Sequence, residues 1–222
     1  MLTETMLEYS TVVVREEEYD KYKEYGHKNL LVIPKGEVHD FMSTFYWIIE
    51  NSPEDVICIL DDDITQFVYR QDEIKKIGKD DEGREIITSE LERIGQLLVD
   101  LKLGLAFSGI NMAHYVYDKE FGFKGMVGPI RWINKLDFKA KYDPNDPAAG
   151  DIDMCYQELL LNRVVLQEKY VCAHAVQNKI IGENENISRQ DHIAYVSAMK
   201  NKWGKYYLYD FKKNEARINV KR

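Results

Sequence analysis

The chain has 222 residues, of which 45% are hydrophobic and 31% are charged, and its formal net charge is −8. These proportions are those of an ordinary globular protein with a sizeable core. No apolar run approaches the ~20 residues needed to cross a bilayer, and the N-terminus lacks the basic and apolar stretches of a signal peptide. Three widely spaced cysteines (Cys58, Cys155 and Cys172) are typical of reduced core residues, not of a disulfide framework or a zinc site. We therefore expect a cytoplasmic protein.

Three apolar runs lie in the first part of the chain, with a helix-like segment between each run and the next. Strands are expected over residues 11–14, 30–33 and 56–60, and helices over residues 16–25 and 40–50. Asp40 is the expected N-cap of the second helix. This order predicts an α/β domain with a mostly parallel central sheet flanked by helices. Right-handed crossovers would place the strand ends near Arg15, Lys35 and Asp61 along one edge, where a nucleotide-sized ligand would fit.

The later part of the chain alternates helices and strands around two long loops. Helices are expected over residues 88–103 and 187–203 and in a segment ending at 161, and strands over 105–107, 126–133, 164–166, 170–172 and 205–211. The charged residues 71–83 are typical of a hairpin or excursion outside the core. The loop at residues 109–125 is long for a compact domain, which favours a functional role.

Three consecutive acids, Asp61, Asp62 and Asp63, follow the third apolar run directly. Open α/β sheets bind ligands at the carboxyl ends of their strands. Carboxylates this close repel one another unless water or a cation neutralises them. The run therefore favours a hard-metal site, with a solvated strand end as the alternative.

A second acidic pair, Asp151 and Asp153, opens a predicted helix, where the macrodipole favours negative charge. Helix capping explains one of the two acids. The pair also fits a carboxylate base with a supporting partner. His174 follows a strand-like run, and the two acidic clusters make it a candidate metal ligand.

The C-terminal segment differs in charge from the rest of the chain. From Lys200 to Arg222 there are eight basic and two acidic residues, so this segment carries about +6 and the preceding body about −14. Five aromatic residues interleave with the positive charges. Such a segment can hold phosphates and stack bases, or it can be an edge strand whose lysines discourage aggregation. The pattern slightly favours the edge strand.

Taken in order, these residues resemble a GT-A fold glycosyltransferase. The DxD motif of that fold corresponds to Asp61-Asp62-Asp63, the downstream acidic motif to Gly150-Asp151-Ile152-Asp153, and the metal-binding histidine to His174. Residues 31–36 and 47–67 are more narrowly similar to the TET-associated glycosyltransferases found largely in bacteriophages. The resemblance covers roughly residues 11–175, and Gly150 stands where the family usually has a glutamate. Neither a dinucleotide fingerprint nor a Walker-type loop occurs.

The resemblance implies a GT-A-like domain over residues 1–204 and a basic aromatic tail over residues 205–222. The domain would comprise a nucleotide-sugar half at about 1–70 and an acceptor half at about 84–204. It would be a metal-dependent hexosyltransferase that moves sugar from a UDP-sugar, most simply UDP-glucose, to hydroxymethylated pyrimidines in phage DNA. Its location would be the host cytoplasm, away from membranes.

The same resemblance assigns roles to individual residues. The Mn²⁺ or Mg²⁺ ion would be bound by Asp63, Asp61 and His174, and the donor would be contacted by Arg15, Lys35, Asp61 and Asp62. The general base would come from Asp151 or Asp153, with Asp151 favoured.

Three alternatives stay open at this point. The same chemistry with a glycan, lipid or protein acceptor agrees better with the overall acidity, whereas the basic C-terminal segment favours DNA. A nucleotidyltransferase also builds metal sites from strand-end carboxylates, but it releases pyrophosphate. A non-catalytic nucleotide-binding or metal-binding module is the third possibility. The oligomeric state is open.

Overall fold

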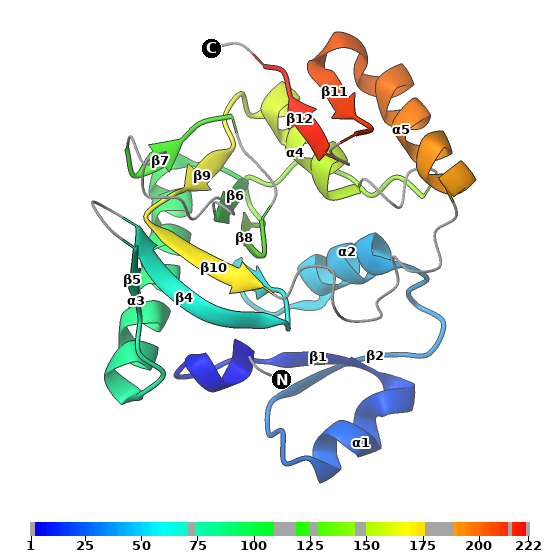
Figure 1. The fold of residues 1–222 in the computed structure, drawn as a ribbon. Coiled ribbons are helices and arrows are strands. Elements are labelled where there is room, and N and C mark those ends of the chain that lie inside the picture. The colour runs from blue at the N-terminus through cyan, green and yellow to red at the C-terminus, as the bar shows by residue number, and fades with distance from the viewer. Residues whose placement is uncertain are drawn as a thin grey trace.

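The first apolar runs form strands where the sequence predicts them, but these strands belong to different sheets. The computed structural model describes residues 3–70, 74–108, 119–124, 128–144, 150–175, 189–212 and 215–220. The first elements are η1 (Thr3–Met6), β1 (Val12–Arg15), η2 (Glu16–Glu18), α1 (Tyr19–Glu24) and β2 (Leu30–Ile33). β1 and β2 pair in parallel as a two-stranded ladder, which lies with α1 at one end of the molecule (Figure 1).

The central sheet has five strands in the order β3-β8-β6-β9-β7. Their bounds are β3 (Val56–Leu60), β8 (Ile130–Asn134), β6 (Leu105–Ser108), β9 (Leu166–Glu168) and β7 (Phe121–Gly122). Within this sheet β6 and β9 pair in parallel, whereas the other three pairings are antiparallel. The prediction of a mostly parallel central sheet is therefore wrong, and the sheet is mixed. An apolar run does not fix the direction of a strand, and β3 lies at the edge of this sheet with Ile57 as its one buried residue.

A third sheet begins immediately after the aspartate run. β4 (Ile64–Arg70) lies between β10 (Val171–Ala175) and β5 (Ile74–Lys76), and both pairings are antiparallel. The predicted hairpin or excursion over residues 71–83 contributes β5 of the β4–β5 pair, whereas β4 precedes it and α3 begins within it. It does not lie wholly outside the core, because Ile77 is buried in the main hydrophobic cluster.

Helices cover both faces of the central sheet. α3 (Asp81–Leu101) packs on one face, where Ile94 and Leu98 join a core with Trp132. α2 (Phe41–Asn51) and α4 (Gly150–Leu161) pack on the other, around Phe107. Alternate residues of each strand point to opposite faces of the sheet, as the pleat requires, and so contribute to different cores. Both cores combine residues from before position 70 and after position 84, and the division into donor and acceptor halves stays a prediction.

Local capping sets the ends of two of these helices. The Asp40 carboxylate accepts the Ser43 N–H at 2.7 Å in a capping box, which confirms Asp40 as the N-cap of α2. The Asp80 carboxylate likewise accepts the Gly83 N–H at 3.0 Å. α3 therefore begins at Asp81, earlier than the predicted start at residue 88.

The C-terminal segment folds back onto α4. It comprises α5 (Arg189–Trp203), η6 (Gly204–Tyr206), β11 (Tyr207–Asp210) and β12 (Glu215–Ile218), with β11 and β12 paired as a hairpin. Tyr207 is buried against Tyr156 in a third hydrophobic cluster. The predicted terminal strand is therefore confirmed as β11, and the described part of the predicted tail is a packed hairpin. None of the described helices is long and apolar enough to span a membrane.

Candidate active site

The aspartate run forms a turn that the N-terminal residues hold in place. The Asp61 N–H donates to the Pro129 carbonyl at 2.9 Å, which continues the β3–β8 ladder. The buried Thr3 hydroxyl donates to the Asp61 carbonyl at 2.7 Å and accepts the Ile64 N–H at 3.2 Å. Thr3 thereby bridges the two ends of the turn, so the backbone that carries the three acids is held on both sides.

Arg131 is the cation at this turn. It lies on β8 opposite Ile59, and therefore on the same sheet face as α2 and α4. Its Nη1 donates to the Asp61 Oδ1 at 2.6 Å, and its side chain is only 6% exposed. The guanidinium carbon also lies 5.4 Å and 5.8 Å from the ring centroids of Phe41 and Phe45. A buried cation of this kind requires a charged partner, and Asp61 provides it.

Asp151 joins this pair from the first turn of α4. Burial raises the pKa of the Asp151 carboxyl, the nearby Arg131 guanidinium lowers it, and the Asp61 carboxylate raises it. The Ile152 N–H donates to Asp151 Oδ1 at 2.7 Å. Asp61, Arg131 and Asp151 therefore form one electrostatic cluster, called here the Asp–Arg–Asp cluster. It joins the two acidic motifs that the sequence singles out.

Gly150 explains how α4 reaches this position. A Cβ at Gly150 would lie 2.3 Å from Met42 Cγ, so a larger residue would require the Met42 side chain or α4 itself to shift. The glycine that replaces the expected glutamate is therefore a close-packing residue. It brings the α4 N-terminus against α2, beside the rings that contact Arg131.

Asp153 has a different environment from Asp151. It is 2% exposed and accepts the Trp203 Nε1–H and the Gln157 Nε2–H, each at 2.7 Å. The Lys202 ammonium lies 2.9 Å from the same carboxylate. These contacts fasten α5 to α4 and occupy both carboxylate oxygens. Asp153 is thus engaged in contacts between helices, and both acids stay candidates for the base, with Asp151 favoured.

Asp62, a predicted donor contact, and His174, a predicted ion ligand, both lie near the turn. Asp62 is exposed, and its charge contributes to the raised pKa of Tyr22 on α1, after burial and Glu18. His174 is exposed on β10, opposite Gln66 near the start of β4. Across the described ranges, no three His, Cys, Asp or Glu side chains are grouped so as to hold an ion.

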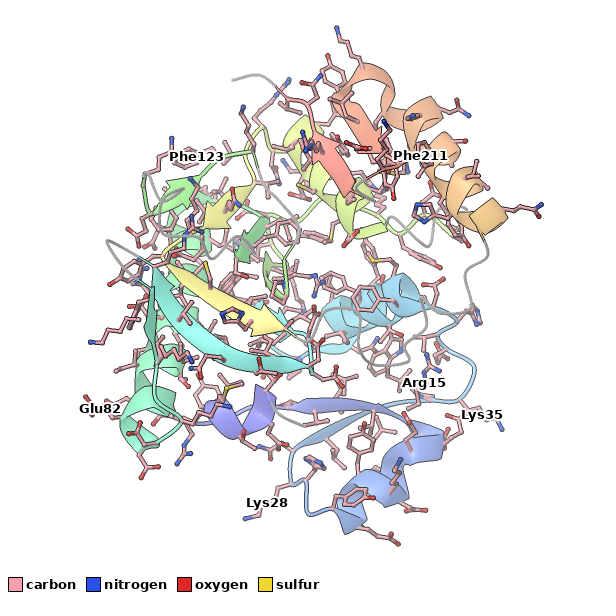
Figure 2. The ribbon with its side chains drawn as sticks, in the orientation of Figure 1. Arg15, Lys28, Lys35, Glu82, Phe123 and Phe211 are labelled. Atoms are coloured by element: carbon pink, nitrogen blue, oxygen red, sulfur yellow. The ribbon has the colours of Figure 1, made fainter. Side chains whose placement is uncertain are left out.

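The predicted donor contacts Arg15 and Lys35 lie together. Arg15 ends β1 opposite Ile33 of the parallel strand β2, and the Lys35 N–H donates to the Glu16 carboxylate at 2.9 Å. Figure 2 shows both side chains at the same end of this ladder. The prediction that Arg15, Lys35 and Asp61 share one sheet edge is wrong, because β3 belongs to the central sheet.

Sequence reasoning missed Arg131 and Glu168. Each is a single charge within a short strand of mostly buried residues, and that pattern itself signals a buried charge that needs partners. The predicted functional loop at residues 109–125 lies mostly outside the described residues.

The burial of the Glu168 carboxyl group leads to a prediction about the stability of the protein. It is 1% exposed, its Oε1 accepts the N–H groups of Tyr170 (2.5 Å) and Val171 (2.9 Å), and burial raises its pKa from 4.5 to about 7. Between these values the unfolded chain loses its proton first, so stability falls as pH rises. Glu168→Gln removes the cost of keeping an ionised carboxylate buried. It should therefore stabilise the protein by up to about 3 kcal/mol at pH 8, with no gain near pH 4. Urea unfolding across pH measures the difference, and an equal gain at both pH values would contradict it.

The fold and the cluster together define a mixed α/β protein that joins carboxylates from two separate motifs around one buried arginine. The chain belongs to the TET-Associated Glycosyltransferase family, whose model matches residues 2–160. The protein is accordingly a glycosyltransferase, and the family implies a nucleotide-sugar donor. The match includes the whole Asp–Arg–Asp cluster and ends before His174 and α5. No curated protein sequence matches the chain.

Proposed function

We propose that the protein transfers a hexose from a UDP-sugar, most simply UDP-glucose, to the hydroxymethyl group of a modified pyrimidine in DNA. The proposed fold is a variant of GT-A in which the central sheet is mixed. The observation that carries the reaction is the Asp–Arg–Asp cluster. It couples the strand-end turn, where a diphosphate would bind, to a carboxylate at a helix N-terminus, where an acceptor hydroxyl would lose its proton.

The burial of Asp151 favours proton transfer to it. Burial raises the pKa of the Asp151 carboxyl, the Arg131 guanidinium offsets part of that rise, and the Asp61 carboxylate adds to it. A carboxylate with a raised pKa is a stronger base. In the proposed step the acceptor oxygen forms a bond to the anomeric carbon and its proton passes to Asp151. The bond from that carbon to the diphosphate breaks, and UDP leaves with the electron pair.

A divalent ion fits this proposal when the donor completes its coordination. Mg²⁺ and its relatives are commonly held by one or two carboxylates together with substrate phosphates. Asp63 is the proposed carboxylate ligand, because Asp61 already pairs with Arg131. His174, on the neighbouring strand β10, remains a candidate. Such an ion would neutralise charge on the departing diphosphate. Arg15 and Lys35 are proposed to contact the donor from the β1–β2 ladder, and Asp62 from the turn.

The test is to incubate the protein with Mn²⁺ and a panel of UDP-sugars over DNA that contains hydroxymethylated pyrimidines. We expect a hexose on the modified nucleoside after digestion and mass spectrometry, with release of UDP. DNA with unmodified pyrimidines is the matched control and should stay unglycosylated. Release of pyrophosphate would instead indicate nucleotidyl transfer. Absence of both sugar transfer and donor hydrolysis would contradict the proposal.

A further inference from the structure

The C-terminal unit, residues 189–212 and 215–220, lies outside the span that the family model matches. It consists of α5, η6 and the β11–β12 hairpin, and it has its own hydrophobic cluster against α4. Figure 1 shows it beside α4, at the opposite end of the molecule from the β1–β2 ladder. It is therefore distinct from the elements that carry the Asp–Arg–Asp cluster.

The unit is attached next to the candidate base. Ile152 packs against its hydrophobic cluster, and the Asp153 carboxylate binds Lys202 and the Trp203 ring nitrogen. These two residues directly follow Asp151 in the first turn of α4. A molecule bound on the C-terminal unit would thus be held close to the residue that is proposed to accept the acceptor proton.

The outer surface of the unit combines exposed aromatic rings with lysines. Tyr206 is 47% exposed and Phe211 is 55% exposed. The Lys205 ammonium lies 5.4 Å from the Tyr206 ring centroid, and the Lys200 ammonium lies 5.5 Å from that of Phe211. Figure 2 shows Phe211 between β11 and α5. Rings interleaved with cations are the usual means of stacking bases and holding phosphates without reading sequence.

The uneven charge of the chain indicates that the partner of this surface is a polyanion. The segment from Lys200 to the C-terminus carries about +6, whereas the preceding body carries about −14. A chain of phosphates would be repelled by the body and attracted to the C-terminal unit. The unit also contains the acidic residues Asp210 and Glu215, which are paired in the backbone register of the hairpin, but basic residues outnumber them.

We propose that the C-terminal unit is the docking surface for the acceptor DNA strand, with Tyr206 and Phe211 stacking on unpaired bases and Lys200, Lys205 and Lys212 binding phosphates. This inference rests on the proposed function, because it assumes a nucleic-acid acceptor. The surface holds the strand beside α4 and thereby presents one nucleotide to Asp151. In this proposal the C-terminal unit provides the affinity for the DNA strand, and the Asp–Arg–Asp cluster provides the groups for sugar transfer.

The test measures binding of a fluorescent single-stranded oligonucleotide to the full-length protein by anisotropy, over a range of salt concentrations. The variant Phe211→Ala should weaken binding about tenfold through lost stacking. The double variant Lys205→Glu with Lys212→Glu should weaken it at least as much. It should also make the negative slope of log affinity against log salt concentration shallower by more than about 1.

Matched controls come from the rest of the surface. Phe123 is 48% exposed and Lys28 is exposed beside β2, and Figure 2 shows both away from the C-terminal unit. Phe123→Ala and Lys28→Glu should keep the parental affinity. Equal affinity of all variants overturns the docking surface while leaving the proposed function intact. A parent protein that hydrolyses UDP-sugar but binds no oligonucleotide overturns the docking surface and the DNA acceptor, but not sugar transfer.

Discussion

Replacing Asp151 by asparagine is expected to reduce the rate of sugar transfer by about 10²- to 10⁴-fold, the usual contribution of a general base. The asparagine keeps the shape of the side chain but cannot accept the acceptor proton. Burial and Asp61 raise the pKa of Asp151, so ionised Asp151 destabilises the folded protein above the ordinary carboxyl range. The variant should therefore be at least as stable as the parent at neutral pH. Turnover under saturating donor, together with urea unfolding, measures both effects.

Asp153→Asn is the matched control, because the two acids lie in the same helical turn. It weakens the contacts of a buried carboxylate with Lys202 and Trp203, and we expect a loss of about 2–3 kcal/mol of stability. The folded fraction should still transfer sugar at a rate near that of the parent. Normal turnover in Asp151→Asn combined with lost turnover in folded Asp153→Asn would reverse the assignment of the base.

Replacing Arg131 by methionine is expected to cause the second large effect, in stability and activity together. Methionine fills much of the same space against Phe41 and Phe45 but leaves Asp61 without its buried cation. Removing one partner of a buried pair usually costs 3–5 kcal/mol. We expect about 3 kcal/mol, because the Asp61 side chain is 33% exposed to water. Unfolding in urea measures this loss, and sugar transfer by the folded fraction should fall as well.

Arg131→Lys separates charge from geometry. Lysine restores a cation but lacks the planar fork that bonds to one carboxylate while facing another. We expect it to recover most of the stability and only part of the activity. If Arg131→Met were as active as the parent, Arg131 would be a packing residue and the Asp–Arg–Asp cluster would not organise the site.

Much of the local structure follows from short-range sequence signals. The capping box at Asp40, the apolar run before Asp61 and the acidic start of α4 each act through neighbours a few residues away. These interactions are nearly independent of the rest of the fold, so their sequence pattern is sufficient. The placement of the two acidic motifs at element ends was predictable for the same reason.

The composition of the site depended on contacts that no local pattern contains. Arg131 and Asp61 are 70 residues apart in the sequence, and they meet because β8 pairs with β3. The sequence offered two acids in the first turn of α4. Only the packing of α5 showed that Asp153 is engaged by Lys202 and Trp203.

By itself the sequence predicted many of the strands and helices, although not β4 or β12, and it showed that a run of three acids follows an apolar strand. The tertiary structure decided which strand lies beside that run, which cation neutralises it and which downstream acid stays available. The physical reason is that periodicity and capping are short-range, whereas strand pairing and the neutralisation of buried charge depend on residues brought together by the whole fold. The aspartate run can be read from the sequence, but its partner Arg131 is identified only by the pairing of β8 with β3 in the sheet.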